Sequence, residues 1–335
     1  MLYRPPAVDD RALWDIWLSV HRLQTLSAAY ELEIFHTLAD GPLTAAELAA
    51  RRGFDLRATK VVLAMLGALG LVRSDGSAYG LTEVSETYLL PDSSFDWGPL
   101  IAKIGVIPDM HRQLVQAVRG TKSISGPASA WALGQMSPQL AASVSRIMHC
   151  HSLPAAVALG AMSAFGSVRR LLDVGGGSGV FSIALAQQHP KMRCTVMELA
   201  AVCEVAQGYI LDGGVSDRVD TKPVDMFRDP WPEGYDAVLF SNVFHDWNAE
   251  TNAHLARSAF GVLPSAGKIL VHEMLVDDTG GPPTTAGFSV RMLTTNEGKQ
   301  YTLAELAALL ESAGFVDISE VRAHLYYSLV IGTKA

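Results

Sequence analysis

The chain has 335 residues, 49% of them hydrophobic and 18% charged, so it can bury a sizeable core and is long enough for two domains. Its 26 Lys and Arg against 34 Asp and Glu give a formal charge of −8, which would repel nucleic-acid backbones and anionic lipid. Residues 1–15 lack the apolar core of a signal peptide, and no apolar run is long enough to cross a bilayer. We therefore expect a cytoplasmic protein with neither a membrane nor a nucleic acid as its partner.

The apolar residues between Asp9 and Leu38 recur at intervals of three and four, which predicts two amphipathic helices. Thr44 and Glu47 have the spacing of a capping box at the start of a third helix, and Gly53 can end it. A fourth helix is expected after Asp55, its predicted N-cap.

Two short strands around an Asp75-Gly76 turn follow this fourth helix. Helix, helix and hairpin in this order predict a winged helix, a module that often binds DNA. A DNA-reading helix needs several exposed Arg, Lys, Asn or Gln side chains, but here only Arg57 and Lys60 accompany an apolar run over residues 61–69. We interpret the module as a packing or dimerisation element.

The next segment, up to residue 165, is predicted to be mostly helical, with breaks at Pro108, Gly126-Pro127 and Pro138. From residue 166 short apolar runs alternate with helical stretches, which predicts a parallel sheet with helices on both faces. The last two strand-like runs have no helix between them, so we expect that pair to be antiparallel.

Three glycines follow a predicted strand in LLDVGGGSGVF, residues 171–181. In a doubly wound sheet, the first strand-to-helix turn is the usual cradle for a nucleotide. An NAD fingerprint needs glycine in its first, third and sixth places, but Gly175, Gly177 and Gly179 take the first, third and fifth, and Val180 stands sixth. After the acidic Asp173, this spacing is instead typical of a loop that passes close to the amino acid part of S-adenosylmethionine (SAM).

Two further carboxylates stand where the rest of SAM would lie. Glu198 ends the second strand and can accept hydrogen bonds from both ribose hydroxyls. Asp225 follows the third strand and can accept one from the adenine amino group, while Met226 and Phe227 pack on the ring. Each carboxylate alone could be a solvated loop residue, but together they favour SAM as the ligand.

His245 follows the fourth strand in SNVFHDWNAET, at the end of the sheet where the methyl group of SAM is expected. A phenol with a pKa of about 10 is a weak nucleophile at neutral pH, and a histidine with a pKa of about 6.5 can take its proton. A lone histidine is otherwise more often a structural residue or a helix cap. Glu273, which ends the fifth strand, could accept the second imidazole N–H or lie in water.

The motifs DVGGGSG, VDMF, FHDWNAE and AGF resemble those of the SAM-dependent small-molecule O-methyltransferases of plant and bacterial natural-product pathways. The resemblance covers nearly the whole chain. It implies an α/β fold: a Rossmann-like class I methyltransferase domain with a mostly parallel seven-stranded sheet, after an N-terminal, mostly helical winged-helix dimerisation domain. We place the dimerisation domain at residues 1–95, a helical bridge that contributes to the acceptor pocket at 96–165, and the SAM-binding domain at 166–335.

The same resemblance implies roles around the base. His245 would be the general base, with Asp246 beside it in the motif and Glu273 flanking it. Gln300 stands where plant members carry a second glutamate at the base. A neutral amide can hydrogen-bond the imidazole but stabilises its cation less well, so we expect a weaker base.

Residues for the acceptor are also implied. The stretch MHCHS is similar to a family segment in which Met148 would touch the acceptor and Ser152 the cofactor carboxylate, and MLTTN suggests Met292 and Asn296 as acceptor-site residues. The loop at residues 280–283 is expected to line the same site, and no pattern in it predicts the acceptor.

Some cofactor contacts must differ from those of plant members, because Ser241 replaces their cofactor-contacting lysine and MELA replaces their aspartate-leucine-proline. His149 and His151 suggest a metal site with His245, but they lack ligand spacing with a carboxylate, so we expect no metal.

The three scattered cysteines form no CxxC pair, which argues against a disulfide framework or a thiolate metal site; we expect Cys150, Cys194 and Cys203 to be buried filler.

The leading hypothesis is methyl transfer from SAM to a hydroxyl of a small, largely aromatic acceptor. Three alternatives stay open: methylation at carbon or nitrogen on the same fold, a SAM-bound enzyme that does not methylate, and a winged-helix regulator. A homodimer is expected as well, because the apolar stripes of the N-terminal helices need a covering surface.

Overall fold

The computed structural model describes residues 11–54, 56–104, 127–276 and 283–335. The chain forms two compact units, residues 1–108 and 109–335. The predicted cap Asp55, the breaks at Pro108 and Gly126, and residues 280–282 lie outside the described residues.

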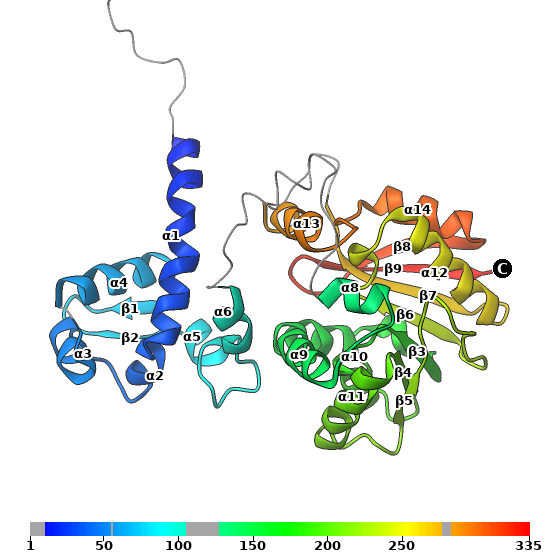
Figure 1. The fold of residues 1–335 in the computed structure, drawn as a ribbon, viewed down its shortest axis with the longest axis horizontal. Coiled ribbons are helices and arrows are strands. Elements are labelled where there is room, and N and C mark those ends of the chain that lie inside the picture. Colours follow the sequence, from blue (N-terminus) through cyan, green and yellow to red (C-terminus); the bar gives the residue numbers. More distant parts are fainter. Residues whose placement is uncertain (1–10, 55, 105–126, 277–282) are drawn as a thin grey trace, which may run out of the picture. The chain divides into compact units, whose positions relative to one another are not determined.

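The first unit is mostly helical (Figure 1). Its elements are α1 (Arg11–Glu31), α2 (Ile34–Ala39), α3 (Ala45–Arg52), α4 (Leu56–Ala68), β1 (Val72–Ser74), β2 (Tyr79–Leu81), α5 (Glu83–Tyr88) and α6 (Gly98–Ile104). The two N-terminal helices and the succession of helix, helix and antiparallel hairpin expected of a winged helix are confirmed.

Local hydrogen bonds explain where the winged-helix elements begin and end. Thr44 and Glu47 form the predicted capping box at the start of α3, and Gly53 ends that helix at φ 69°. In the hairpin, the Asp75 carboxylate accepts hydrogen bonds from the backbone N–H groups of Ser77 (2.9 Å) and Ala78 (2.8 Å), which fixes the turn.

The second unit alternates strands and helices along the chain. Its elements are α8 (Pro127–Ala132), α9 (Pro138–Gly160), η1 (Ser163–Phe165), β3 (Arg170–Val174), α10 (Val180–Gln188), β4 (Arg193–Glu198), α11 (Ala200–Asp212), β5 (Val219–Pro223), β6 (Ala237–Ser241), η2 (Phe244–Asp246), α12 (Ala249–Val262), β7 (Lys268–Met274), α13 (Pro283–Thr295), α14 (Leu303–Ser312), β8 (Phe315–Arg322) and β9 (Tyr327–Lys334). Pro127 and Pro138, both predicted breaks, begin α8 and α9.

The seven-stranded sheet has the order β5-β4-β3-β6-β7-β9-β8. The strands β3 to β7 pair in parallel and the last pair, β8 and β9, is antiparallel, both as predicted. The strand β9 is also antiparallel to β7, which was not predicted. The chain moves outward from β3 through β4 to β5 and then returns to place β6 on the other side of β3. The strand order therefore reverses between β3 and β6, and ligands of such sheets bind at this point.

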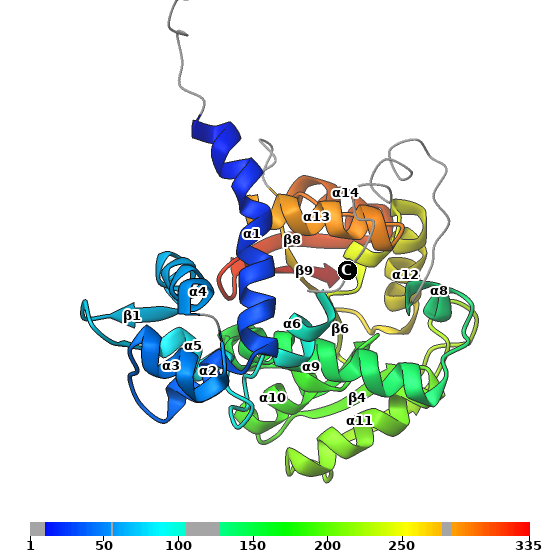
Figure 2. The same cartoon turned by 60° about the vertical axis from the view of Figure 1, so that its left-hand side comes forward.

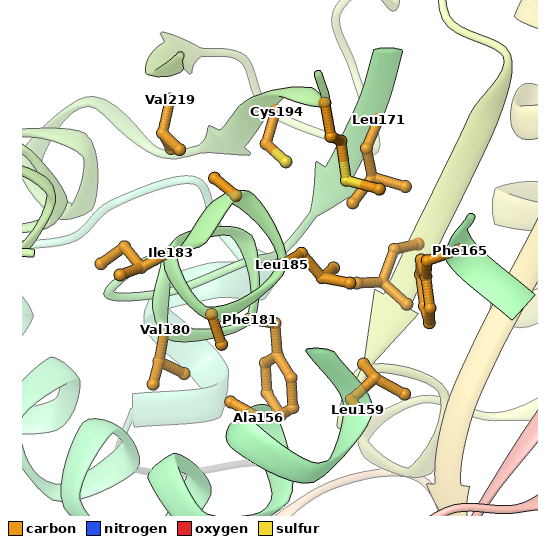
Figure 3. Close-up of a cluster of buried hydrophobic side chains, with 14 of the residues drawn as sticks. Ala156, Leu159, Phe165, Leu171, Val180, Phe181, Ile183, Leu185, Cys194 and Val219 are labelled. Carbon is orange, nitrogen blue, oxygen red and sulfur yellow. The ribbon is translucent and has the colours of Figure 1, made fainter. Parts of the chain in front are cut away.

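Helices cover both faces of this sheet, as predicted (Figures 1 and 2). Alternate residues of the central strands point to opposite faces: Leu171 packs with α9, α10 and α11, and Leu172 packs with α12 and α14. Figure 3 shows the first of these cores, in which Phe181 of α10 lies beside Ala156 of α9. Burying a large apolar side chain contributes about 1.5–3 kcal/mol to the stability of the folded protein. Two such cores therefore hold the sheet rigidly, including the carboxyl ends of its parallel strands.

The cysteine prediction is also confirmed, since Cys150, Cys194 and Cys203 are all buried thiols. In the part of the chain that the structure describes, no helix is long and apolar enough to span a membrane.

Candidate functional site

The glycine loop lies directly after β3, at the point where the strand order reverses. Gly175, Gly177 and Gly179 have φ values of 66°, 57° and 76°, a left-handed conformation that residues with a side chain rarely adopt. The loop therefore turns tightly into α10, so that its backbone can come close to a ligand.

Asp173, the last residue but one of β3, is fully buried beneath this loop. Ser182 donates a hydrogen bond of 2.7 Å to its Oδ2, whereas Oδ1 has no partner among the described residues. A Cβ atom on Gly176 would lie 2.7 Å from the carboxyl group, so the loop sits directly on it. Burial raises the pKa of Asp173 to about 6. A buried acceptor atom without a donor is expected where a ligand binds.

Glu198 ends β4, where a ribose is expected, and only 5% of its surface is exposed. Its Oε2 accepts hydrogen bonds from the backbone N–H of Leu199 (2.9 Å) and from the indole N–H of Trp131 (3.2 Å). Burial raises the pKa of Glu198 to about 7, although these hydrogen bonds oppose the rise.

Helix α8 contacts both the predicted ribose position at Glu198 and the predicted adenine position at Asp225. The sequence did not predict these contacts of α8. Trp131 binds Glu198, and the carbonyl oxygen of Ala132 accepts a hydrogen bond of 2.7 Å from Arg228. Arg228 in turn pairs with the Asp225 carboxylate. Only tertiary structure brings Trp131 to a strand end 67 residues away, so no local pattern could have shown this contact.

Asp225, Met226 and Phe227 form the turn after β5. Asp225 Oδ1 accepts the backbone N–H of Phe227 at 2.9 Å, and the Phe227 ring meets Trp247 edge-on with 4.8 Å between ring centroids. The structure thus places this turn and the HDW motif side by side. Adenine recognition by these residues stays a prediction.

His245 lies in η2, just beyond β6, and is 5% exposed. Its Nδ1 is 2.7 Å from Oε2 of Glu273, a carboxylate that is 1% exposed at the end of β7. Glu273 Oε1 also accepts the backbone N–H groups of Val243 (3.1 Å) and His245 (3.3 Å). Of the two alternatives, a partner of the imidazole or a carboxylate in water, the structure therefore shows the first.

Burial alone would lower the pKa of His245, but the carboxylates of Glu273 and Asp246 outweigh it and raise that pKa to about 9. With Nδ1 held by Glu273, the nitrogen left to exchange a proton is Nε2, which lies 3.5 Å from Asp246 Oδ1. Because the two partners are buried together, the ring is held in one orientation.

Helix α13 and the residue after it, Asn296, bring the predicted acceptor residues next to this base. The Phe288 ring meets His245 edge-on at 5.5 Å, and the amide of Asn296 donates hydrogen bonds to Asp246 and, at 3.5 Å, to the sulfur of Met292. The structure thus brings Met292 and Asn296 to the base, as their predicted role requires.

Gln300 is 1% exposed, and its backbone N–H donates to Ser289 Oγ at 3.2 Å. Neither Oε1 nor Nε2 of its side chain has a hydrogen-bond partner among the described residues. The hydrogen bond to His245 that we expected of this amide is not formed. Two unsatisfied buried polar atoms cost free energy, and such atoms are expected where a ligand or an ordered water binds.

Other predicted residues divide into buried and exposed ones. Ser241 ends β6, and its hydroxyl lies 2.8 Å from Nδ1 of the buried His272. Ser152 is buried on α9, with its hydroxyl 3.3 Å from His151 Nδ1, whereas Met148 is 38% exposed. Their contacts with cofactor and acceptor stay predictions.

His149, considered above for a metal site, instead binds the glycine loop. Its Nδ1 lies 2.9 Å from the hydroxyl of Ser178, and its ring stacks on Tyr209 with centroids 4.1 Å apart. Within the described ranges, no three His, Cys, Asp or Glu side chains are grouped so that they could hold a metal ion.

These residues fit SAM. The left-handed loop can approach its amino acid part, the unpartnered oxygen of Asp173 lies beneath that loop, and Glu198 offers a buried carboxylate for the ribose. SAM supplies a methyl group on a positively charged sulfur, which a nearby nucleophile can attack.

Comparison with known proteins agrees with this geometry. The O-methyltransferase domain model matches residues 112–316, and the O-methyltransferase dimerisation domain model matches residues 14–91. The chain belongs to the O-methyltransferase family. SAM is accordingly its methyl donor, and its reaction is methyl transfer.

Curated relatives and solved structures match almost the whole chain. The chain is 35% identical to 3-hydroxy-5-methyl-1-naphthoate 3-O-methyltransferase of Streptomyces sahachiroi, over 95% of this chain and 93% of that protein. It is 28% identical to L-tyrosine C(3)-methyltransferase of Streptomyces lavendulae, over 92% and 87%. The crystal structure of human N-acetylserotonin methyltransferase in complex with SAM superposes with a TM-score of 0.82 at 26% identity, covering 99% of this chain and 100% of the human one.

The position of Glu198 predicts a test of cofactor binding. Glu198→Gln should weaken S-adenosylhomocysteine binding about 10- to 100-fold at pH 8, since hydrogen bonds to a charged acceptor contribute about 1.5–3 kcal/mol. Wild-type affinity should fall as the pH drops through about 7, because the carboxyl group takes up a proton, and the variant should lack this dependence. Isothermal titration calorimetry measures both. Glu204→Gln, an exposed change on α11, is the control; equal effects of the two variants would contradict the assignment.

Proposed function

We propose that this O-methyltransferase methylates a hydroxyl of a small aromatic acceptor, with His245 as the general base. The pair of His245 and Glu273, 2.7 Å apart at the carboxyl edge beside the glycine loop, carries the proposal. A histidine whose Nδ1 is held by a buried carboxylate presents Nε2 in one orientation, as a base that must reach an acceptor hydroxyl requires.

In this mechanism the chain holds the cofactor and the acceptor, aligns them, and removes the proton of the acceptor hydroxyl. The glycine loop, Glu198 and Asp225 hold the cofactor, and alignment supplies much of the acceleration. His245 Nε2 takes the hydroxyl proton as the acceptor oxygen gains the methyl group, and Glu273 stabilises the imidazolium that forms. SAM, when bound, would supply the methyl group and leave as S-adenosylhomocysteine, so the products would be the methyl ether and S-adenosylhomocysteine.

An aromatic acceptor is supported by the apolar side chains near the base and by the names of relatives. Phe288 and Met292 of α13 lie beside His245 and Asn296, and the relative at 35% identity is named for a hydroxynaphthoate. We further propose that the helical bridge, residues 96–165, contributes Met148 to the same site. The cytoplasmic location and the absence of nucleic acid as a partner stay predictions.

Methylation at carbon is the second candidate. It is favoured by the relative named as an L-tyrosine C(3)-methyltransferase and by the Gln300 amide, which makes no hydrogen bond to the imidazole. Electron-rich ring carbons can be methylated without prior loss of the hydroxyl proton, so alignment alone could suffice.

The first prediction for this function separates the two reactions. Incubation with labelled SAM and a panel of phenols should give methyl ethers, identified by mass spectrometry and NMR. His245→Ala should lower kcat about 10²- to 10⁴-fold, the usual contribution of a general base. His254→Ala, on the exposed face of α12, is the control. Products methylated at carbon, or a His245→Ala enzyme that keeps most of its turnover, would favour the second candidate.

The second prediction concerns pH. Because Glu273 and Asp246 raise the pKa of His245 to about 9, the neutral imidazole becomes available only as the pH rises, and kcat/KM should climb with its midpoint near that value and level off above it. Glu273→Gln removes a negative charge, which lowers the pKa of the imidazole, so the midpoint should move to lower pH while the plateau falls. Glu311→Gln on the surface of α14 serves as the control. Superimposable profiles for Glu273→Gln and wild type would rule out this pairing.

We also propose that the chain is a homodimer formed through its first unit. Helix α1 exposes Ile16 (70%), Val20 (51%) and Leu23 (37%), which share one face at helical spacing. A contiguous apolar stripe in a segment that matches a dimerisation domain is what an interface between two copies requires.

Light scattering after size exclusion should therefore give twice the chain mass of 35.9 kDa. Replacing Ile16, Val20 and Leu23 together by serine should shift the protein toward the monomer, because the stripe loses its apolar surface. Leu211→Ser, on an equally exposed leucine of α11 (69%), should leave the mass unchanged. A wild-type monomer at micromolar concentration would contradict the proposal.

A further inference from the structure

The glycine loop carries one polar side chain, that of Ser178, between two of its left-handed residues. Gly177 and Gly179 have φ values of 57° and 76°, and the N–H of Gly179 donates a hydrogen bond of 2.9 Å to the carbonyl oxygen of Gly176 across the same turn. Glycine has more conformational freedom than any other residue, so a loop this rich in glycine needs contacts that fix its shape.

His149 of α9 supplies such a contact. Its Nδ1 lies 2.9 Å from the hydroxyl of Ser178, a residue that is 2% exposed. At its start the loop is joined to β4, because the N–H of Gly175 donates to the carbonyl oxygen of Met197 at 2.9 Å. The imidazole holds the later part of the loop, so both parts are tied to elements of the second unit.

The imidazole ring of His149 is itself fixed. It stacks on the ring of Tyr209 of α11, with 4.1 Å between the centroids and 15° between the ring planes. Burial lowers the pKa of His149 to about 4, so the ring is neutral at physiological pH. A neutral ring on a flat aromatic surface keeps Nδ1 directed at the loop and adds no charge to the site.

The same face of α9 carries Ser152, three residues after His149, and this serine is 4% exposed. The sequence predicts that Ser152 contacts the cofactor carboxylate. One helix face thus carries a residue that binds the loop and a residue predicted to bind the cofactor itself.

We propose that His149 is a positioning residue for the cofactor: through Ser178 it holds the glycine loop in the conformation that receives SAM. A loop that is ordered before binding loses less conformational freedom when the ligand arrives, so the contact raises the affinity for the ligand without touching it. The inference rests on the predicted place of SAM at this loop and not on the role proposed for His245.

Two substitutions at His149 separate the hydrogen bond from the stacking. His149→Phe keeps an aromatic ring on Tyr209 and loses Nδ1, whereas His149→Asn loses the ring and keeps an amide atom at the same number of bonds from the backbone as Nδ1. In the full-length protein, His149→Phe should weaken binding of S-adenosylhomocysteine about 3- to 10-fold, the contribution of one hydrogen bond, and His149→Asn should retain most of the affinity. Calorimetric titration measures both.

Substitution of the partner completes the comparison. Ser178→Ala should weaken binding by about the same factor as His149→Phe, and the double variant should bind no more weakly than either, because both changes remove the same hydrogen bond. Hydrogen exchange of the unliganded protein is the second measurement. The amides of residues 175–179 should exchange faster in His149→Phe and Ser178→Ala than in the wild type, and His149→Asn should stay close to the wild type.

His189 provides a matched control in the same unit. It is also half-buried, its Nε2 lies 2.9 Å from the carbonyl oxygen of Gly160, and its ring centroid is 6.4 Å from that of Phe165. His189→Phe loses a comparable hydrogen bond at the other end of α10. It should therefore leave the exchange of the loop amides and the affinity for S-adenosylhomocysteine unchanged, whatever it does to the melting temperature.

The outcomes decide between positioning and packing. If His149→Phe leaves the affinity and the loop exchange unchanged, or if His189→Phe changes them as much, the inference is overturned. It is also overturned if His149→Asn behaves like His149→Phe, because the stacking on Tyr209 would then hold the loop. Ser178→Ala decides the matter if His149→Phe does not fold. If all variants behave as expected but no phenol receives a methyl group, the inference stands and the proposed function fails.

Discussion

The reversal of strand order between β3 and β6 is the constraint on which the site depends. The strands β3 and β6 are parallel neighbours, and the connections that follow them lead to opposite sides of the sheet. The glycine loop after β3 and η2 after β6 therefore lie together at the carboxyl ends of these two strands. The cofactor loop and the base come from residues about 70 apart in sequence, 175 and 245, yet neighbouring strands place them together. Two packed cores on the faces of the sheet keep that edge rigid.

Three buried carboxylates lie at the carboxyl ends of the strands, and they determine the electrostatics of the site. Asp173, Glu198 and Glu273 are 0%, 5% and 1% exposed, and burying a charge without full compensation costs several kcal/mol. Glu273 is compensated within the protein by His245 and two backbone N–H groups. Burial raises the pKa values of Asp173 and Glu198, and one oxygen of Asp173 has no partner among the described residues. A ligand that donates hydrogen bonds to these carboxylates would therefore favour their charged forms.

Sequence predicted the parts of the site that belong to strand ends. The glycine spacing and the acidic residues at the ends of β3, β4 and β7 are local patterns, and the rule for ligands of parallel sheets places Glu273 near His245. The Trp131 hydrogen bond to Glu198 and the unbonded Gln300 amide were not predictable. Both depend on how helices and loops far apart in sequence dock on that edge, and no periodicity records such docking.

The acceptor side obeys a different logic, because it depends on single residues of one helix face and not on the sheet. Phe288 of α13 packs edge-on against the His245 ring, and Asn296, which follows that helix, donates a hydrogen bond to Asp246. The charges that raise the pKa of His245 come from Glu273 on β7 and Asp246 in η2, which belong to the strand ends. The sheet thus sets the proton affinity of the base, whereas α13 and the residue after it set what packs around it. A change of side chain on α13 alters the surroundings of the acceptor and leaves the contact between Glu273 and His245 in place.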